Sequence, residues 1–225
     1  MGGESRARRG DSVYIKDHLI MSTNLPELKQ TVFLVDDDLS VRSALGNLIE
    51  SAGLPVHQFS SAEEFLEYWQ PPMAGCLVLD VRLPRMSGME LLGRLSASAA
   101  IPVIIMTAHG DIPMVKRALK AGATEFLTKP FNDDELLSAI QQAFKADRTR
   151  RQSEAVLGSI RARHASLSER ELQVFELVTQ GKLNKEIADE LHLSVVTVKL
   201  YRRQLMEKMQ ADSLADLVRM RERIS

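Results

Sequence analysis

The chain has 225 residues, more than one typical domain contains, and 44% of them are hydrophobic, which is enough to fill two modest cores. This composition excludes a chain that is disordered throughout. The formal net charge is −1, but residues 31–146 carry −5 (9 basic, 14 acidic) and residues 147–225 carry +3 (15 basic, 12 acidic). An acidic first part followed by a basic second part favours a cation site in the former and a polyanionic partner for the latter.

A single cysteine, Cys76, excludes an internal disulfide and a multi-cysteine metal cluster, and it fits a reducing compartment, for which we expect the cytoplasm. Apolar runs such as residues 76–79 and 101–106 are strand-sized, far below the roughly 18 residues that a membrane span requires. The first 30 residues imitate a signal peptide only weakly, because charged side chains interrupt their apolar stretch. We expect residues 1–30 to form a mobile tail, and Met21 is an alternative start that the sequence leaves open.

From residue 31 to residue 146, short β-rich runs alternate with helical patterns. The strand-like runs are TVFLV, PVHQF, GCLVL, PVIIM and TEFLT, and the helical patterns after them span 40–52, 62–69, 87–95, 112–121 and 132–144. Five repeats of strand then helix predict the α/β class, with a five-stranded parallel sheet covered by helices on both faces. In such doubly wound sheets, ligands bind beyond the carboxyl ends of the strands.

Polar side chains follow four of these strands: Asp36 and Asp37 the first, Asp80 the third, Thr107 the fourth and Lys129 the fifth. Carboxylates that share one rim repel one another unless a hard divalent cation lies among them, and oxygen ligands of this kind suit magnesium. A carboxylate held in this way can attack phosphorus, while the hydroxyl and the ammonium receive the oxygens of the transferred group. Lys129-Pro130 is a candidate cis peptide. Each residue alone also has a plainer interpretation, as a cap, a strand residue or solvated surface.

The motifs VDDD, LDVRLPRMSG, MTAHGD and KPF together resemble the receiver domain of two-component response regulators, over residues 31–146. The resemblance implies a flavodoxin-like fold and phosphorylation of Asp80 by a sensor histidine kinase. It also places Thr107 and Phe126 at the family's switch positions, although phenylalanine departs from the tyrosine common there. The magnesium ligands that it implies are Asp36 through water, Asp37, Asp80 and the backbone carbonyl of Arg82.

Residues 147–165 are rich in arginine with few apolar positions, and they predict a linker that begins as a helix. Beyond it, helical patterns at 169–180, 185–191, 195–209 and 214–223 predict a small all-α bundle within residues 166–225. Asn184 can cap the second of these helices and Ser194 the third. The residues of the third helix that we expect to face inward are Val195, Val198, Leu205 and Met209.

The stretch SLSERELQVFELVTQGKLNKEIADELHLSVVTVKLYRRQLMEKM resembles the LuxR-type helix-turn-helix of the FixJ and NarL regulators, over residues 166 to about 223. The resemblance implies that the helix over 195–209 enters the major groove of promoter DNA. The expected base contacts are Lys199, Leu200 and Arg203. The expected phosphate contacts are Lys185, Thr197 and Arg202. Tyr201 stands where many relatives carry histidine, so a backbone contact there can differ.

We therefore expect a transcription factor and not an enzyme. Phosphorylation of Asp80 is expected to drive homodimerisation through residues 112–127, promoter binding, and regulation, most simply activation, of transcription by RNA polymerase. Two alternatives stay open. One is a receiver joined to an enzyme, although residues 147–225 carry no nucleophile-base pair, metal-ligand spacing or glycine-rich phosphate loop. The other is a C-terminal bundle that binds protein or RNA. The sequence names neither the regulated genes nor the signal.

Overall fold

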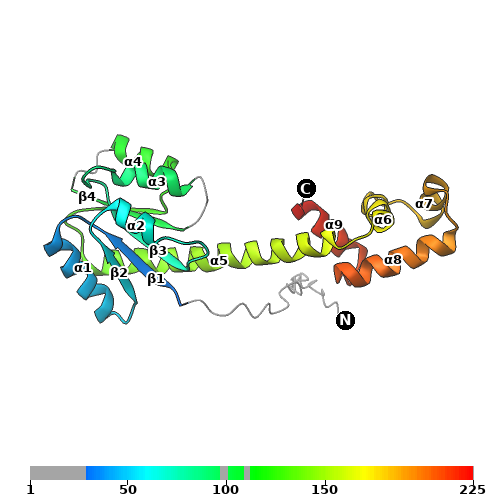
Figure 1. The fold of residues 1–225 in the computed structure, drawn as a ribbon, viewed down its shortest axis with the longest axis horizontal. Coiled ribbons are helices and arrows are strands. Elements are labelled where there is room, and N and C mark those ends of the chain that lie inside the picture. The colour runs from blue at the N-terminus through cyan, green and yellow to red at the C-terminus, as the bar shows by residue number, and fades with distance from the viewer. Residues whose placement is uncertain (1–28, 97–100, 109–111, 225) are drawn as a thin grey trace, which may run out of the picture.

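The computed structural model describes residues 29–96, 101–108 and 112–224. Figure 1 shows a sheet domain and a helical domain at opposite ends of one long helix. The expected N-terminal tail lies outside the described residues, apart from its last two, Lys29 and Gln30. Residues 109–111, the last three of the motif MTAHGD, also lie outside the described residues.

The first domain is built on one parallel sheet. Its strands are β1 (Thr31–Val35), β2 (Val56–Phe59), β3 (Gly75–Asp80), β4 (Val103–Thr107) and β5 (Glu125–Thr128). They pair in the order β2-β1-β3-β4-β5, so the direction of strand addition reverses between β1 and β3. The prediction of a doubly wound, five-stranded parallel sheet is confirmed.

Helices cover both faces of this sheet (Figure 1): α1 (Leu39–Ser51), α2 (Ala62–Tyr68), α3 (Gly88–Ser96), α4 (Ile112–Lys120) and the start of α5 (Asp133–Ala165). Side chains alternate along each strand, so every strand contributes to two cores. Phe33 of β1 packs in one core with Phe65 of α2 and Leu91 of α3. Leu34, the next residue, packs in the other with Ile49 of α1 and Ile140 of α5.

The helix α5 is longer than its sequence pattern. The pattern ends at residue 144, whereas the structure has one helix of 33 residues from Asp133 to Ala165. The expected linker, residues 147–165, is therefore the second half of this helix. Apolar spacing fades there because the segment has little to pack against, and ion pairs such as Arg150–Glu154, at 2.9 Å and one turn apart, support it instead. The domain boundaries at 31, 146 and 166 stay predictions.

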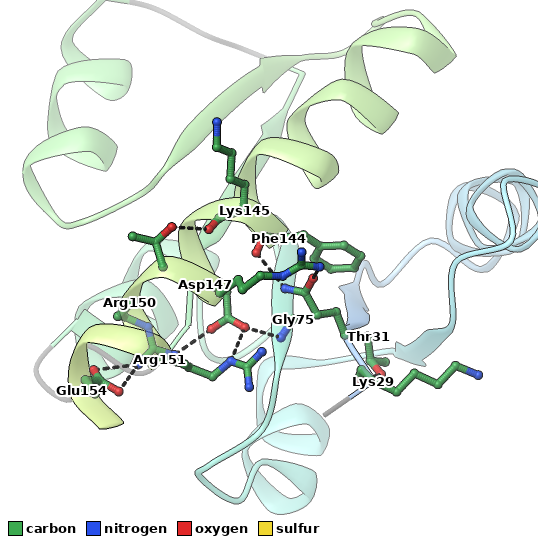
Figure 2. A network of polar contacts seen from close by, with 12 residues as sticks. Lys29, Thr31, Gly75, Phe144, Lys145, Asp147, Arg150, Arg151 and Glu154 are labelled. Atoms are coloured by element: carbon green, nitrogen blue, oxygen red, sulfur yellow. Dashed lines mark hydrogen bonds and ion pairs between the residues drawn. The ribbon is translucent and has the colours of Figure 1, made fainter. Parts of the chain in front are cut away.

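A buried carboxylate fastens α5 to the sheet where the helix leaves it (Figure 2). The side chain of Asp147 is fully buried. Its Oδ2 accepts hydrogen bonds from the backbone N–H of Gly75 at 3.1 Å and from Nε of Arg151 at 2.8 Å. Its Oδ1 accepts one from Nη2 of Arg150 at 2.7 Å. Gly75 opens β3, and β3 ends at Asp80, so the central strand joins this anchor to the acidic rim.

The close approach of β3 to β1 at this end of the sheet requires glycine at position 75. This residue has a φ of +142°, and a Cβ there would lie 1.8 Å from the carbonyl oxygen of Thr31. Only glycine fits this approach between β3 and β1. Nearby, Gln30 donates from Nε2 to the carbonyl oxygen of Phe144 at 2.7 Å, and Arg148 donates to Oε1 of Gln30 at 3.3 Å. These contacts add a second tie between β1 and α5.

The second domain consists of the end of α5 with α6 (Glu169–Thr179), α7 (Asn184–Leu191), α8 (Val195–Met209) and α9 (Leu214–Ile224). Their apolar faces meet in one core, which includes Ile160, Phe175, Ile187, Leu205 and Met220. The prediction of an all-α second domain is confirmed. Ser194 caps α8 as expected, because its Oγ accepts from the N–H of Thr197 at 3.0 Å.

Two local predictions in this domain are wrong. Asn184 is not the cap of α7: the cap residue is Leu183, whose N–H donates to Oε2 of Glu186 at 2.6 Å. Val195 does not face inward, since it is 40% exposed, whereas Val198, Leu205 and Met209 are buried as expected. Both errors arise at helix starts, where a shift of one residue changes which side chain caps and which one packs.

Candidate functional site

Four strands bring the predicted pocket residues to one rim. Asp36 follows β1 directly, Asp80 ends β3, Thr107 ends β4 and Lys129 follows β5. The register places these ends at similar levels, since Val35 pairs with Leu79, Asp80 with Met106, and Thr107 with Thr128. The rim lies at the reversal of strand order, where doubly wound sheets bind their ligands.

Lys129 joins the two buried carboxylates of this rim. Its Nζ donates to Oδ2 of Asp36 at 2.7 Å and to Oδ1 of Asp80 at 2.6 Å. Burial raises the pKa of Asp36, and the ammonium of Lys129 opposes that rise only in part. Burial lowers the pKa of Lys129, but the hydrogen bonds and negative charges of both aspartates outweigh it, so the net shift is upward. Lys129 therefore stays charged at neutral pH. Its bond to Pro130 is cis, as predicted.

Backbone amides fix the remaining carboxylate oxygens. The N–H of Arg82 donates to Oδ2 of Asp80 at 2.6 Å, and the N–H of Asp38 donates to Oδ1 of Asp36 at 3.0 Å. Asp38 itself caps α1 by accepting from the N–H groups of Ser40 and Val41. Asp37, between them, is exposed at the rim. The three consecutive aspartates thus have different environments: Asp36 is buried, Asp37 is exposed at the rim and Asp38 caps α1.

The donor set fits magnesium in kind. Asp36, Asp37, Asp80 and the carbonyl of Arg82 supply only oxygen, the ligand type that this ion prefers. Within the described residues, no three His, Cys, Asp or Glu side chains already surround one point in the manner of a closed metal site. Magnesium keeps several of its waters in proteins, so a partial set of protein ligands is sufficient. The Lys129 ammonium meanwhile offsets the repulsion between the two buried carboxylates.

The two expected switch residues lie on adjacent strands. Thr107 is buried, and its Oγ1 lies 3.9 Å from Sδ of Met114 in α4, so the hydroxyl faces that helix. Phe126 of β5 pairs with Ile105 of β4, two residues before Thr107, and it is only partly buried against the core. A rotation of Thr107 toward Asp80 would therefore change its contact with α4.

In the second domain, the expected base-contacting residues share one exposed face of α8. Lys199 is exposed, Leu200 is 54% exposed, and the side chain of Arg203 is 79% exposed. Arg203 donates from Nε to Oε1 of Glu207 at 2.9 Å, one turn along the same face. Lys185 of α7 is exposed as well. The hydroxyl of the half-buried Thr197 lies 2.8 Å from that of Ser194.

Arg202 is placed differently from the other expected contacts. It is only partly exposed, and its Nη1 donates to Oδ1 of Asn184 at 2.9 Å. It also borders a cavity of about 140 Å³ with Leu205 and Leu217. Arg202 thus links α7 to α8, the two helices of the helix-turn-helix. Its expected phosphate contact stays a prediction.

Two matches to family models decide the class of protein. Residues 32–141 match the response regulator receiver domain, and residues 165–221 match the luxR family of bacterial regulatory proteins. Relatives are similar along nearly the whole chain, with 48% identity to Nodulation protein W of Bradyrhizobium diazoefficiens over 86% of each chain. The chain is a two-component response regulator with a LuxR-type DNA-binding domain.

Other relatives of this response regulator agree. Transcriptional regulatory protein FixJ of Bradyrhizobium diazoefficiens is 45% identical over 85% of this chain and 94% of its own. Response regulator protein TodT of Pseudomonas putida is 43% identical over 89% of each chain. Among solved structures, response regulator StyR has a TM-score of 0.77 at 49% identity and covers 86% of this chain and 98% of its own. Full-length FixJ from B. japonicum has a TM-score of 0.53 at 44% identity, over 87% and 97%.

The family regulates transcription and implies a sensor kinase and DNA as partners of this response regulator. Within the described residues, no helix is both long and apolar enough to cross a membrane. Sequence reasoning missed Arg42, whose Nη1 donates to the carbonyl oxygen of Asp36 at 2.6 Å, and Met114, which faces Thr107. Both lie on helices, one turn inside, where spacing alone does not distinguish a pocket contact from solvated surface or core.

Proposed function

We propose that this response regulator accepts a phosphoryl group on Asp80 from a sensor histidine kinase and that its phosphorylated form binds promoter DNA through α8. The observation that carries the first half is the position of the Asp80 carboxylate, at the strand-order reversal and held by Lys129 and the amide of Arg82. The observation that supports the second half is the exposed face of α8 that carries Lys199 and Arg203. We also propose a cytoplasmic location and activation of RNA polymerase.

The chemistry follows from the residues of the rim. An oxygen of Asp80 attacks the phosphorus of the kinase phosphohistidine, the phosphorus–nitrogen bond breaks, and the imidazole leaves with the bonding electrons. Lys129 then donates one of its hydrogen bonds to a phosphoryl oxygen instead of a carboxylate, and its positive charge offsets the negative charge of the phosphoryl group. Thr107 rotates away from Met114 and donates its hydroxyl to the same group. Asp37, Asp80 and the carbonyl of Arg82, with Asp36 through water, would hold a magnesium ion, which would supply positive charge to offset the phosphoryl oxygens.

Magnesium removal is expected to abolish this reaction. Acetyl phosphate should add one phosphate to the protein in magnesium buffer and none after chelation by EDTA, because the single ammonium of Lys129 does not offset two carboxylates and a phosphoryl group. Intact-protein mass spectrometry measures the gain, and re-addition of magnesium is the control for an irreversible effect. Equal labelling with and without the metal would show that the pocket works without it.

Arg203 is expected to discriminate between bases. Replacing it by alanine should weaken binding to a selected operator by about 1 to 3 kcal/mol and weaken binding to scrambled duplex much less. Gel shifts at fixed salt concentration measure both affinities. The matched control is Arg170→Ala, since Arg170 is an exposed arginine of α6 that donates to Gln173 in its own helix. Equal losses on both duplexes for Arg203→Ala would make it a phosphate contact.

Phosphorylation is expected to drive dimerisation through α4 and β5. This surface exposes Ile112 at 71% and Leu119 at 50%, and Lys116, Lys120 and Glu125 provide both signs of charge for a reciprocal contact. Thr107 and Phe126 adjoin it, so a shift of either changes its shape. Two linked helix-turn-helix units then read half-sites about one DNA turn apart.

Light scattering with and without acetyl phosphate tests this dimer. The measured mass of the wild type should double on phosphorylation. The Leu119→Glu variant should accept phosphate but stay monomeric, because at a two-fold contact each new carboxylate would lie near the same carboxylate of the other copy and the two would repel. A phosphorylated protein that remains monomeric at tens of micromolar and still binds DNA more tightly would point instead to relief of a contact between the two domains.

A further inference from the structure

The surface of α8 that we propose to face DNA carries two exposed apolar side chains as well as its lysine and arginine. Attraction to DNA phosphates accounts for the two cations but not for the apolar pair. Val196 is 77% exposed and Leu200 is 54% exposed, and they are one helical turn apart. Lys199 and Arg203 form a parallel exposed pair on the same helix. At 3.6 residues per turn, all four side chains lie within about 100° of the helix circumference. The face is therefore an apolar ridge beside a basic one.

Among the residues that the structure describes, none of the second domain covers this ridge, since Val196 and Leu200 stay exposed. The helix packs through its opposite side, where Val198, Leu205 and Met209 are fully buried in the bundle core. Ser194 fixes the start of the helix by capping the N–H of Thr197, so the backbone that carries Val196 is ordered. A single exposed apolar residue needs no explanation, but an aligned apolar pair beside two cations lies where this class of protein meets DNA.

We infer that Val196 and Leu200 read thymine by packing against its C5-methyl group in the major groove. Among the groups that base pairs expose there, that methyl is the apolar one, and aliphatic side chains recognise it. Val196 lies in the first turn of the helix, and the residues near the start of a recognition helix contact base edges. Lys199 and Arg203 hold the neighbouring phosphates or guanines, so the ridge is pressed onto the base edges and water is excluded from it.

This inference rests on the proposed role of α8, and it assigns a base to residues that carry no hydrogen-bonding group. Burial of one methyl group is worth about fourfold in affinity. Each thymine that the ridge contacts should therefore be distinguished from uracil, which differs from thymine only in lacking that methyl. Neither Lys199 nor Arg203 can make this distinction, because a hydrogen bond to the carbonyl oxygen is the same in both bases.

The test begins with a random duplex pool, from which the phosphorylated full-length protein selects an operator. Each thymine of that operator is then replaced singly by deoxyuridine, and gel shifts at fixed salt compare the wild type with Val196→Ala and Leu200→Ala. The wild type should lose about fourfold at two or more positions. Val196→Ala should abolish the loss at one of them and Leu200→Ala at another.

Leu214→Ala is the matched control, since Leu214 is 41% exposed but belongs to α9, and it should keep every deoxyuridine loss of the wild type. A selected operator that tolerates deoxyuridine everywhere would overturn the inference and leave DNA binding intact. Losses that persist unchanged in both α8 variants would also overturn it. A pool that yields no preferred sequence would contradict the proposed function itself.

Discussion

Replacing Asp80 by asparagine is expected to remove phosphorylation completely. The substitution keeps the size of the side chain but replaces the attacking carboxylate oxygen by an amide, which is a far weaker nucleophile. Acetyl phosphate with magnesium should then add no phosphate, by intact mass, under conditions that label the wild type fully. The other buried carboxylate of the rim, Asp36, is less exposed than Asp80, at 2% against 7%, so we expect it not to replace Asp80 as the nucleophile.

The matched control is Asp38→Asn. Asp38 lies in the same acidic triplet, but its carboxylate caps α1, and asparagine caps helices equally well. This variant should be labelled like the wild type. If Asp80→Asn were still modified at the normal rate, the phosphoacceptor would be another residue of the rim.

The second large effect concerns stability. Asp147→Ala is expected to lower the free energy of unfolding by about 3 kcal/mol, since removal of one partner from a buried ion pair leaves the other charges unmatched. The change removes the acceptor of the Gly75 amide and of the Arg151 guanidinium, whose side chain is only 18% exposed. It also removes one of the acceptors of Arg150, whose side chain is 27% exposed and which keeps Glu154. Urea unfolding followed by far-ultraviolet circular dichroism measures the loss.

Glu154→Ala provides the contrast for Asp147→Ala. Glu154 also pairs with Arg150 on the same helix, but its side chain is 56% exposed, so its removal should cost less than about 1 kcal/mol. Similar losses for both variants would mean that Asp147 behaves as a surface residue and does not anchor α5. Because α5 carries the DNA-binding domain, a confirmed anchor makes the amino end of β3 the joint between the two halves.

The five-stranded parallel sheet and the acidic rim were predictable because the signals are local. Each strand run is followed directly by a polar residue, and a parallel sheet brings every strand's carboxyl end to the same edge. Asp36, Asp80, Thr107 and Lys129 therefore meet without any knowledge of side-chain packing. Spacing of the motifs was sufficient to identify these four.

Long-range packing was not predictable in the same way. Asp147 sits in an arginine-rich segment that looks solvated, and only the fold reveals that its carboxylate reaches Gly75, more than 70 residues away. Arg202 and Arg203 are adjacent arginines, yet they lie on different sides of α8, and only Arg202 donates to Asn184 of α7 among the described contacts. Such differences depend on how a helix is rotated against its neighbours, and a shift of one residue reverses them.

The affinity of the full-length protein for its selected operator, before and after phosphorylation, tests the central claim most directly. Gel shifts at fixed salt should show tighter binding after acetyl phosphate treatment of the wild type, by about 5-fold to 150-fold, the range typical of coupled sites. Asp80→Asn should show the same weak binding under both conditions. Equal affinity of the phosphorylated and unphosphorylated wild type would contradict the claim that Asp80 controls DNA binding through α8.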